Sequence, residues 1–251
     1  MGLWLLILIP ILAAPFAWMG QQWSRHAPRW IAIGALLADF LLALLIGTQD
    51  HSVQDSSHGS WLVESHVSWI PRWGISLHLG LDGLSLILIL LTAFIGVVAT
   101  IASWTEIQSR VGLFHCNVLL ALGGVIGVFL AIDLFLFFFF WELMLVPMYL
   151  LIVIWGHTNR QYASFKFFLF TQAGSLVLLV AIVALALLHQ QATGRPSFDY
   201  GDLMGLTLSS EMARWLMLAF LIGFLVKLPA LPFHTWLPDT YAEAPTGATI
   251  I

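Results

Sequence analysis

A single carboxylate within a long apolar stretch is the first residue whose position points to chemistry. Residues 134–155 contain only one ionisable side chain, that of Glu142. A carboxylate near the middle of a membrane span costs roughly 2.5–3.5 kcal/mol on insertion scales. Five residues further on, Pro147 lacks the N–H that would pair with the carbonyl of Leu143. An acid beside a free carbonyl predicts an ion or proton path through a helix bundle.

Lys227 is a second ionisable group deep in an apolar stretch, and Pro229 and Pro232 follow it at once. These prolines remove two helical donors, so we expect a broken helix with unpaired carbonyls at Leu225 and Leu228. Such a break is tolerated at membrane depth only where protein or water satisfies the freed groups. Discontinuous helices beside a charge recur at the ion sites of transporters.

Glu142 and Lys227 together are predicted to act as a proton switch. Approach of the carboxylate would hold a proton on Lys227, and its withdrawal would release that proton. A pKa change of about two units corresponds to roughly 2.7 kcal/mol. Moving one charge across a membrane costs about 2.3 kcal/mol per 100 mV, so one switched pair suffices for a gradient of that order. The alternative is a static structural pair, or a lysine that extends to the interface.

Two further residues are candidates for a proton relay. His234 follows the predicted helix break, and the ordinary histidine pKa near 6.5 suits a residue that passes a proton onward. Lys166 lies at the mouth of the apolar stretch 165–189, where a lysine is more often an anchor than a relay. Asp133 lies at the end of a span, where a structural role is the simpler interpretation. The nine histidines form no helical pair at ligand spacing, so we predict no metal site.

Composition indicates a polytopic membrane protein. Hydrophobic residues make up 60% of the 251-residue chain and charged residues 9%, whereas soluble domains average about 25% charged residues. The net charge of −4 provides no basic patch for nucleic acid, and the single cysteine excludes an internal disulfide or a multi-cysteine iron–sulfur site. No nucleotide-binding motif is present. Seven apolar stretches are expected to cross the bilayer as helices: 3–19, 30–48, 81–103, 111–132, 134–155, 165–189 and 212–232.

The distribution of basic residues predicts the orientation of these spans. The longer polar loops are 49–79 and 190–211. If the first short loop is cytoplasmic, five loop Lys or Arg residues lie on its side of the membrane and three on the other. Because basic loops stay inside, we expect a multi-pass protein of the bacterial inner membrane with its N-terminus outside the cytoplasm. Apolar residues after a Pro-Thr-Gly run at 245–247 predict the start of another span and thus a fragment of a longer protein.

Two segments carry a family resemblance: FFFFWELMLVPMYLLIVIWGH at 137–157 and VKLPALPFHTWLPDTYAEAPT at 226–246. They resemble the subunit M (chain 4) family of the proton-translocating NADH–quinone oxidoreductase, respiratory complex I, one of the antiporter-like membrane subunit families. Weaker matches extend the resemblance over most of residues 70–250: LDGLSLILILLT, GGVIGVFLAIDLFLF and KFFLFTQAGSL.

The resemblance implies an all-α fold, a transmembrane helix bundle with a discontinuous seventh helix that is part of an inverted-repeat antiporter-like architecture. Residues 1–110 would hold three N-terminal helices with a long extracytoplasmic loop. Residues 111–251 would hold an incomplete first repeat, with helices four to seven and the start of the eighth. Glu142 matches a family glutamate held to modulate a lysine, and Lys227 matches the lysine held to carry the proton.

The resemblance also implies a function. The chain would be a proton-translocating, non-redox subunit of NADH:quinone oxidoreductase, and by itself it is not expected to be catalytic. NADH, flavin, iron–sulfur clusters and quinone would be handled by other subunits, so no cofactor or metal is expected in this chain. Its expected partners are the lipid bilayer and the other membrane subunits of complex I, including neighbouring antiporter-like subunits.

Two alternatives stay open. The W-E and V-K-x-P elements are shared with multi-subunit Na+/H+ antiporters, so a subunit of such an antiporter is one of them. The other is a purely structural membrane subunit in which the charges fix helix register. That alternative predicts that neutral replacements of similar shape at Glu142 and Lys227 leave activity intact.

Overall fold

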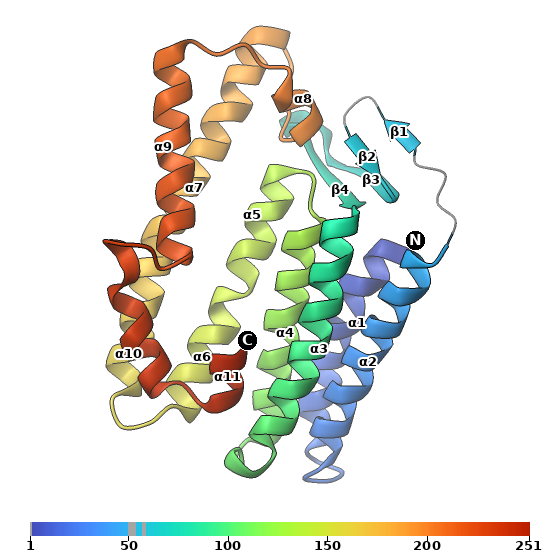
Figure 1. Cartoon of the computed structure of the whole chain (residues 1–251), viewed down its shortest axis with the longest axis vertical. Coiled ribbons are helices and arrows are strands. Elements are labelled where there is room, and N and C mark those ends of the chain that lie inside the picture. The colour runs from blue at the N-terminus through green and yellow to red at the C-terminus, as the bar shows by residue number, and fades with distance from the viewer. Residues whose placement is uncertain (1, 50–53, 57–58) are drawn as a thin grey trace.

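The computed structural model describes residues 2–49, 54–56 and 59–251. Helices α1 to α4 pack side by side, and the α5–α6 pair, α7 and the α9–α10 pair continue the bundle beside them (Figure 1). The helices are α1 (Gly2–Gly20), α2 (Ala27–Gly47), α3 (Gly83–Glu106), α4 (Val111–Leu130), α5 (Leu134–Leu143), α6 (Leu145–Trp155), α7 (Arg160–Thr193), α8 (Tyr200–Met204), α9 (Ser210–Lys227), α10 (Trp236–Glu243) and α11 (Thr246–Ile250).

Six spans in the described residues are long and apolar enough to cross a membrane. Together α5 and α6 form one of them, as predicted for residues 134–155. The predicted seventh, α9, has 18 residues, and its charged residues are Glu211, Arg214 and Lys227. The count of seven spans is therefore not confirmed, although α9 occupies the predicted place. The short helix α11 begins at Thr246, where the start of another span was predicted, and its five residues leave that prediction untested.

The central helix of the bundle is α4. In its span, 67% of the residues are buried, compared with 28–33% in each of the other five. Close approach on two sides depends on glycines, because a Cβ at Gly123 would lie 2.7 Å from Ile11 of α1. A Cβ at Gly127 would lie 2.4 Å from the ring of Phe140. Gly123 and Gly127 are four residues apart, a Gly-x-x-x-Gly spacing typical of close helix contact, and they serve two neighbouring helices.

The fold is mostly helical, as predicted, and it includes four short strands that were not predicted: β1 (Gln54–Ser56), β2 (Gly59–Trp61), β3 (Val63–Ile70) and β4 (Ile75–Leu81). They lie at the end of the bundle where α1 begins (Figure 1), and we call this end the hairpin end. Strands β3 and β4 pair antiparallel, and a 3₁₀ turn, η1 (Pro71–Trp73), joins them. Gly74 closes the turn with φ 69°, a conformation that glycine adopts at little cost.

Candidate functional site

Glu142 lies at a break between two helices. Helix α5 ends at Leu143 and α6 begins at Leu145, so the span is interrupted at Met144. Pro147, whose missing N–H was predicted to leave the carbonyl of Leu143 free, lies three residues after Met144 and is itself buried. Gly124 of α4 packs against the break, where an added Cβ would lie 3.2 Å from the backbone nitrogen of Met144. The carboxylate is half-buried, and its Oε1 is buried with no hydrogen-bond partner among the described residues.

Trp141 holds the neighbouring position and links three helices. Its indole N–H donates to Oγ of Ser175 on α7 over 3.1 Å. Its ring also meets Phe224 of α9 edge to face, with centroids 5.8 Å apart. The ring is thus fixed by a hydrogen bond and by packing, and it separates α5 from α9 at the level of the helix break.

Lys227 is the last residue of α9 and points to this same region. Its Nζ lies 5.0 Å from the centroid of the Trp141 ring, a distance at which the ring face attracts a cation. The Glu142 carboxylate also interacts electrostatically with Lys227. No ion pair closer than 4.0 Å joins the two in the described part of the chain. The structure therefore brings both predicted residues to one region without a close ion pair between them.

A cavity of about 180 Å³ adjoins the lysine. Its lining includes Met144 and Met148, which lie at and just after the break that follows Glu142, and Trp236 beyond α9. Such a volume accommodates several water molecules, since one water occupies about 30 Å³ of liquid. The space allows the ammonium group to move or to exchange a proton with water.

The break after Lys227 differs in detail from the prediction. The carbonyl of Leu225 is not unpaired, because the N–H of Ala230 donates to it over 3.0 Å. The indole N–H of Trp236 also donates to the carbonyl of Val226 over 3.0 Å. Chain beyond the break thus satisfies two carbonyls of the last helical turn, which is how irregular backbone is tolerated at membrane depth.

The two relay candidates lie in different surroundings. His234 lies in the 3₁₀ turn η2 (Phe233–Thr235), and its Nδ1 is buried without a hydrogen-bond partner in the part of the chain that the structure describes. Lys166 forms an ion pair with Asp239 of α10, with Nζ and Oδ2 separated by 2.6 Å. This ion pair links the start of α7 to α10. Pro229 and Pro232 lie in the break between α9 and η2, and Pro232 is exposed.

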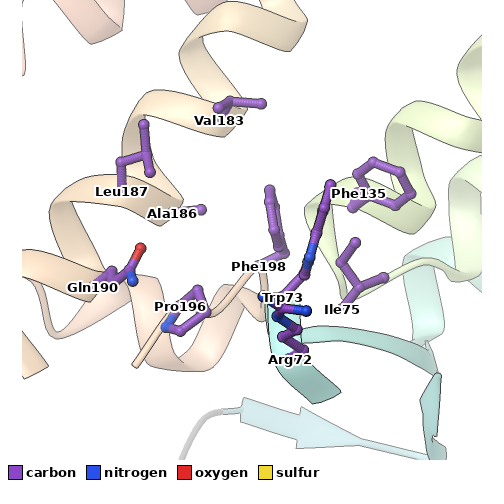
Figure 2. Close-up of a pocket in the computed structure, with 10 residues that line it drawn as sticks. All are labelled: Arg72, Trp73, Ile75, Phe135, Val183, Ala186, Leu187, Gln190, Pro196 and Phe198. Atoms are coloured by element: carbon purple, nitrogen blue, oxygen red, sulfur yellow. The ribbon is translucent and has the colours of Figure 1, made fainter. Parts of the chain in front are cut away.

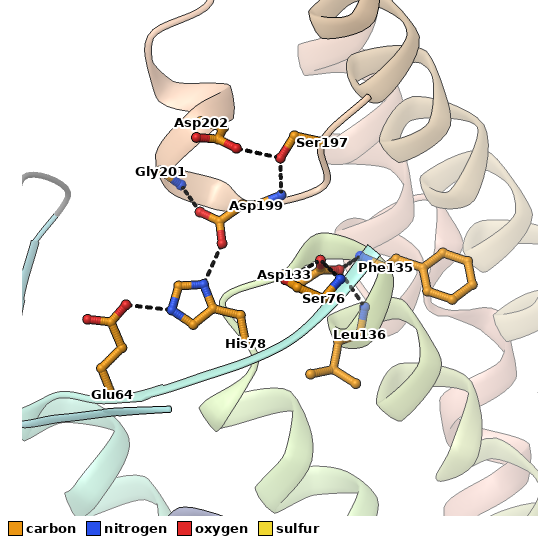
Figure 3. Close-up of polar contacts among 10 residues, drawn as sticks. All are labelled: Glu64, Ser76, His78, Asp133, Phe135, Leu136, Ser197, Asp199, Gly201 and Asp202. Atoms are coloured by element: carbon orange, nitrogen blue, oxygen red, sulfur yellow. Dashed lines mark hydrogen bonds and ion pairs between the residues drawn. The ribbon is translucent and has the colours of Figure 1, made fainter. Parts of the chain in front are cut away.

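A second polar cluster, at the hairpin end, was not predicted. His78 of β4 bridges two acids: its Nε2 lies 2.6 Å from Oε1 of Glu64, and its Nδ1 contacts Asp199 just before α8 (Figure 3). Beside it, Asp133 caps α5 by accepting from the N–H groups of Phe135 and Leu136. The same carboxylate accepts from the N–H and hydroxyl groups of Ser76 on β4. The structural interpretation of Asp133 agrees with these contacts.

Charge within the cluster shifts two pKa values. Burial alone would lower the pKa of His78, but hydrogen bonds and ion pairs with Asp199 and Glu64 outweigh burial and raise it. Burial would raise the pKa of Asp199, but the bridge to His78 outweighs it and lowers that pKa. A sequence signal for β4 was present in 75–81. Apolar residues at Ile75, Leu77 and Leu79 alternate there with other residues, as in a half-buried strand. No group of three or more possible metal ligands occurs in the part of the chain that the structure describes.

Similarity to known proteins agrees with this geometry. The family model described as "NADH:quinone oxidoreductase/Mrp antiporter, TM" matches residues 131–251. The NADH-quinone oxidoreductase subunit M of Pseudomonas aeruginosa is 49% identical over 254 residues, which cover 98% of this chain and 50% of that relative. The chain belongs to this family of antiporter-like membrane subunits. It spans about half the length of the curated relatives it matches.

Solved structures show the fold of the family. A chain of respiratory complex I from Thermus thermophilus with bound NADH superposes with a TM-score of 0.83 at 30% identity, covering 99% of this chain and 49% of that one. A chain of the Mrp complex from Dietzia gives a TM-score of 0.79 at 21% identity, covering 99% of this chain and 26% of that one. The present chain is a multi-pass membrane protein with the antiporter-like helical fold.

Proposed function

We propose that the protein carrying this chain is a proton-translocating membrane subunit of an NADH–quinone oxidoreductase, in which Glu142 and Lys227 form a proton switch. The placement of the Lys227 ammonium over the Trp141 ring, with Glu142 on the next residue, carries the proposal. The two charges interact across a gap, so a small movement of either changes their separation.

The two helix breaks supply the means of movement. Met144 interrupts the span that carries Glu142, and Lys227 ends α9. A charge at the end of a helix turns with a few backbone dihedrals, whereas a charge within a continuous helix moves only with the whole helix. When Glu142 withdraws, the cavity beside Lys227 offers water as proton acceptor. His234 and Lys166 are proposed as further relay groups towards the end of the bundle opposite the hairpins.

Redox chemistry is assigned to other subunits. We propose that NADH, flavin, iron–sulfur clusters and quinone are bound elsewhere in the complex, and that this chain is a non-redox part of the translocase. Its partners are then the other membrane subunits of the complex. We further propose that residues 1–110 form an N-terminal helical unit and that residues 111–251 belong to the first antiporter-like repeat.

The proposed orientation follows from charge. The end of the bundle opposite the hairpins holds Arg25, Arg29, Arg110, Arg160 and Lys166, in loops and first helical turns, and the hairpin end holds Arg72, Arg195 and Arg214. Since basic loops favour the cytoplasm, the hairpin end and the N-terminus face away from it. The membrane is then the inner membrane of a bacterium.

The test uses the full-length protein in its native membrane. Glu142→Gln keeps the shape of the side chain and removes its charge, so NADH-driven proton uptake into inverted vesicles should fall by roughly two orders of magnitude, the usual scale of a lost proton-transfer group. Quinone reduction should fall with it. Glu211→Gln removes an exposed acid at the start of α9 and should change neither rate.

Two results would contradict the proposal. Normal proton uptake and quinone reduction in an assembled Glu142→Gln complex would favour the structural alternative. Proton exchange driven by a sodium gradient, with no response to NADH, would favour the antiporter named in the family description. Assembly is checked in both cases by the amount of complex in the membrane.

A further inference from the structure

A groove of about 380 Å³ lies at the hairpin end of the bundle. Val183, Ala186, Leu187 and Gln190 line it along α7, and Trp73, Ile75 and Phe135 face them from the other side, with Phe198 between (Figure 2). Its floor is buried, since Ile75, Ala186 and Phe198 are 2–7% exposed. The walls are apolar, and the one charged residue among the lining side chains is Arg72.

The position of the groove on α7 places it at the edge of the membrane. The apolar run of this helix ends at Leu188, and His189, Gln190 and Gln191 follow. Val183 and Leu187 belong to an outward stripe with Leu176 and Val180, at spacings that share one helical face. These four side chains are 39–68% exposed. The groove therefore opens onto an exposed apolar face of α7, and its polar rim lies where the apolar run of that helix ends.

Arg72 places a cation at that rim. Its guanidinium has neither a hydrogen bond nor an ion pair among the residues that the structure describes. The nearby acids are already engaged, because Asp199 pairs with His78 and Asp202 accepts from the hydroxyl of Ser197. Trp73, 61% exposed beside it, is of the residue type enriched at membrane interfaces.

We propose that this groove binds one anionic phospholipid, with an acyl chain against α7 and the phosphate on Arg72. A guanidinium donates two parallel hydrogen bonds to phosphate oxygens. Methylene groups removed from water in the groove add favourable free energy in proportion to their area. A head group with a net negative charge keeps the phosphate charge available to the arginine. In a choline head group, the quaternary ammonium already neutralises the phosphate charge. The site is independent of the Glu142–Lys227 switch.

Native mass spectrometry of the purified full-length protein tests the site. Delipidated protein is titrated with dioleoyl phosphatidylglycerol or dioleoyl phosphatidylcholine, and the bound fraction is measured. Phosphatidylglycerol should bind more tightly, and Arg72→Gln should weaken its binding about tenfold while leaving phosphatidylcholine unchanged, since a charge-assisted hydrogen bond is lost. Arg72→Lys retains the charge and should keep most of the affinity. Val183→Trp fills the groove and should weaken both lipids.

Matched controls separate the site from general charge and bulk. Arg214→Gln removes a cation from α9 at the same end of the bundle, and Leu176→Trp adds a ring on the same face of α7 away from the groove. Both should bind phosphatidylglycerol as the unmodified protein does. Equal affinities for the two lipids, or equal losses in Arg72→Gln and Arg214→Gln, would overturn the proposal. Absence of bound lipid in the unmodified protein would also overturn it and would indicate that a protein segment covers the groove.

Discussion

Replacing His78 with leucine should loosen the junction between the hairpin and the segment before α8. The imidazole bridges Glu64 and Asp199, with side-chain exposures of 10% for His78, 29% for Glu64 and 21% for Asp199. A hydrogen bond to a charged group contributes about 1.5–3 kcal/mol. The more exposed Glu64 is rehydrated after the change, so we count one bond, and the expected cost is about 2 kcal/mol. Leucine keeps the bulk of the side chain and removes both donors.

Hydrogen exchange of nearby backbone amides measures this cost. The N–H of Leu134 donates to Phe198, that of Phe198 to Gly74, and that of Tyr200 to Ile132. All three bonds break when the junction opens locally, and their exchange rates report the free energy of that opening. A loss of about 2 kcal/mol corresponds to roughly 30-fold faster exchange, since 1.4 kcal/mol is tenfold.

His66→Leu is the matched control, because His66 is exposed and touches the His78 ring edge to face with centroids 4.9 Å apart. His66→Leu should have little effect on the exchange rates of the three amides. Unchanged exchange in His78→Leu would refute the reasoning, since it would show that the bridge adds nothing to the closed junction. Slower exchange in His78→Leu would also refute the reasoning, since it would show that the bridge does not stabilise the closed junction.

The same junction should depend on pH. The raised pKa of His78 makes its contribution complete below its ordinary value of 6.5 and lost as the pH rises through the raised value. The lowered pKa of Asp199 makes its contribution complete above 3.8 and lost as the pH falls through the lowered value. The ratio of exchange rates between His78→Leu and the unmodified protein should therefore be largest between pH 3.8 and 6.5 and shrink at alkaline pH.

Two further substitutions test the packing around Lys227. Gly174→Ala places a Cβ 2.8 Å from Cβ of Val226 on α9 and should destabilise the protein by about 1–3 kcal/mol through overpacking, seen as a lower midpoint of thermal unfolding in detergent. Gly34→Ala, with no atom within 4 Å of the added Cβ, should not lower that midpoint. Trp236→Phe removes the N–H that donates to the carbonyl of Val226 and should cost about 1–3 kcal/mol in the same assay. A midpoint unchanged by this substitution would show that the carbonyl finds water instead.

Local rules predicted the helix breaks well. The free carbonyl predicted from Pro147 belongs to Leu143, beside the break now seen at Met144, and the break predicted from Pro229 and Pro232 follows the end of α9 at Lys227. These predictions succeeded because a missing N–H acts on the carbonyl four residues earlier, which sequence alone locates. The unpaired carbonyl expected at Leu225 was wrong, because Ala230 curls back to donate to it. The path of the chain after a break depends on what it packs against.

The bridge at His78 shows why part of the structure could not be predicted from the sequence. Its partners lie 14 and 121 residues away in the chain. Segment 49–79 was interpreted as a loop because its polar residues and histidines concealed the strand alternation in 75–81. That strand pairs with β3 and is buried against the turn before α5. These contacts stabilise a strand of alternating apolar and polar residues at the end of a helix bundle.

Sequence by itself determined which segments enter the membrane and where charges lie within them, because transfer of apolar side chains and satisfaction of backbone hydrogen bonds are properties of each segment alone. Tertiary structure decided which of those charges meet. Trp141 and Lys227 are far apart in the chain, and their 5.0 Å contact exists because Gly174 and Gly223 let α7 and α9 approach closely. Close approach of helices follows from the shapes of facing surfaces, which no single segment specifies.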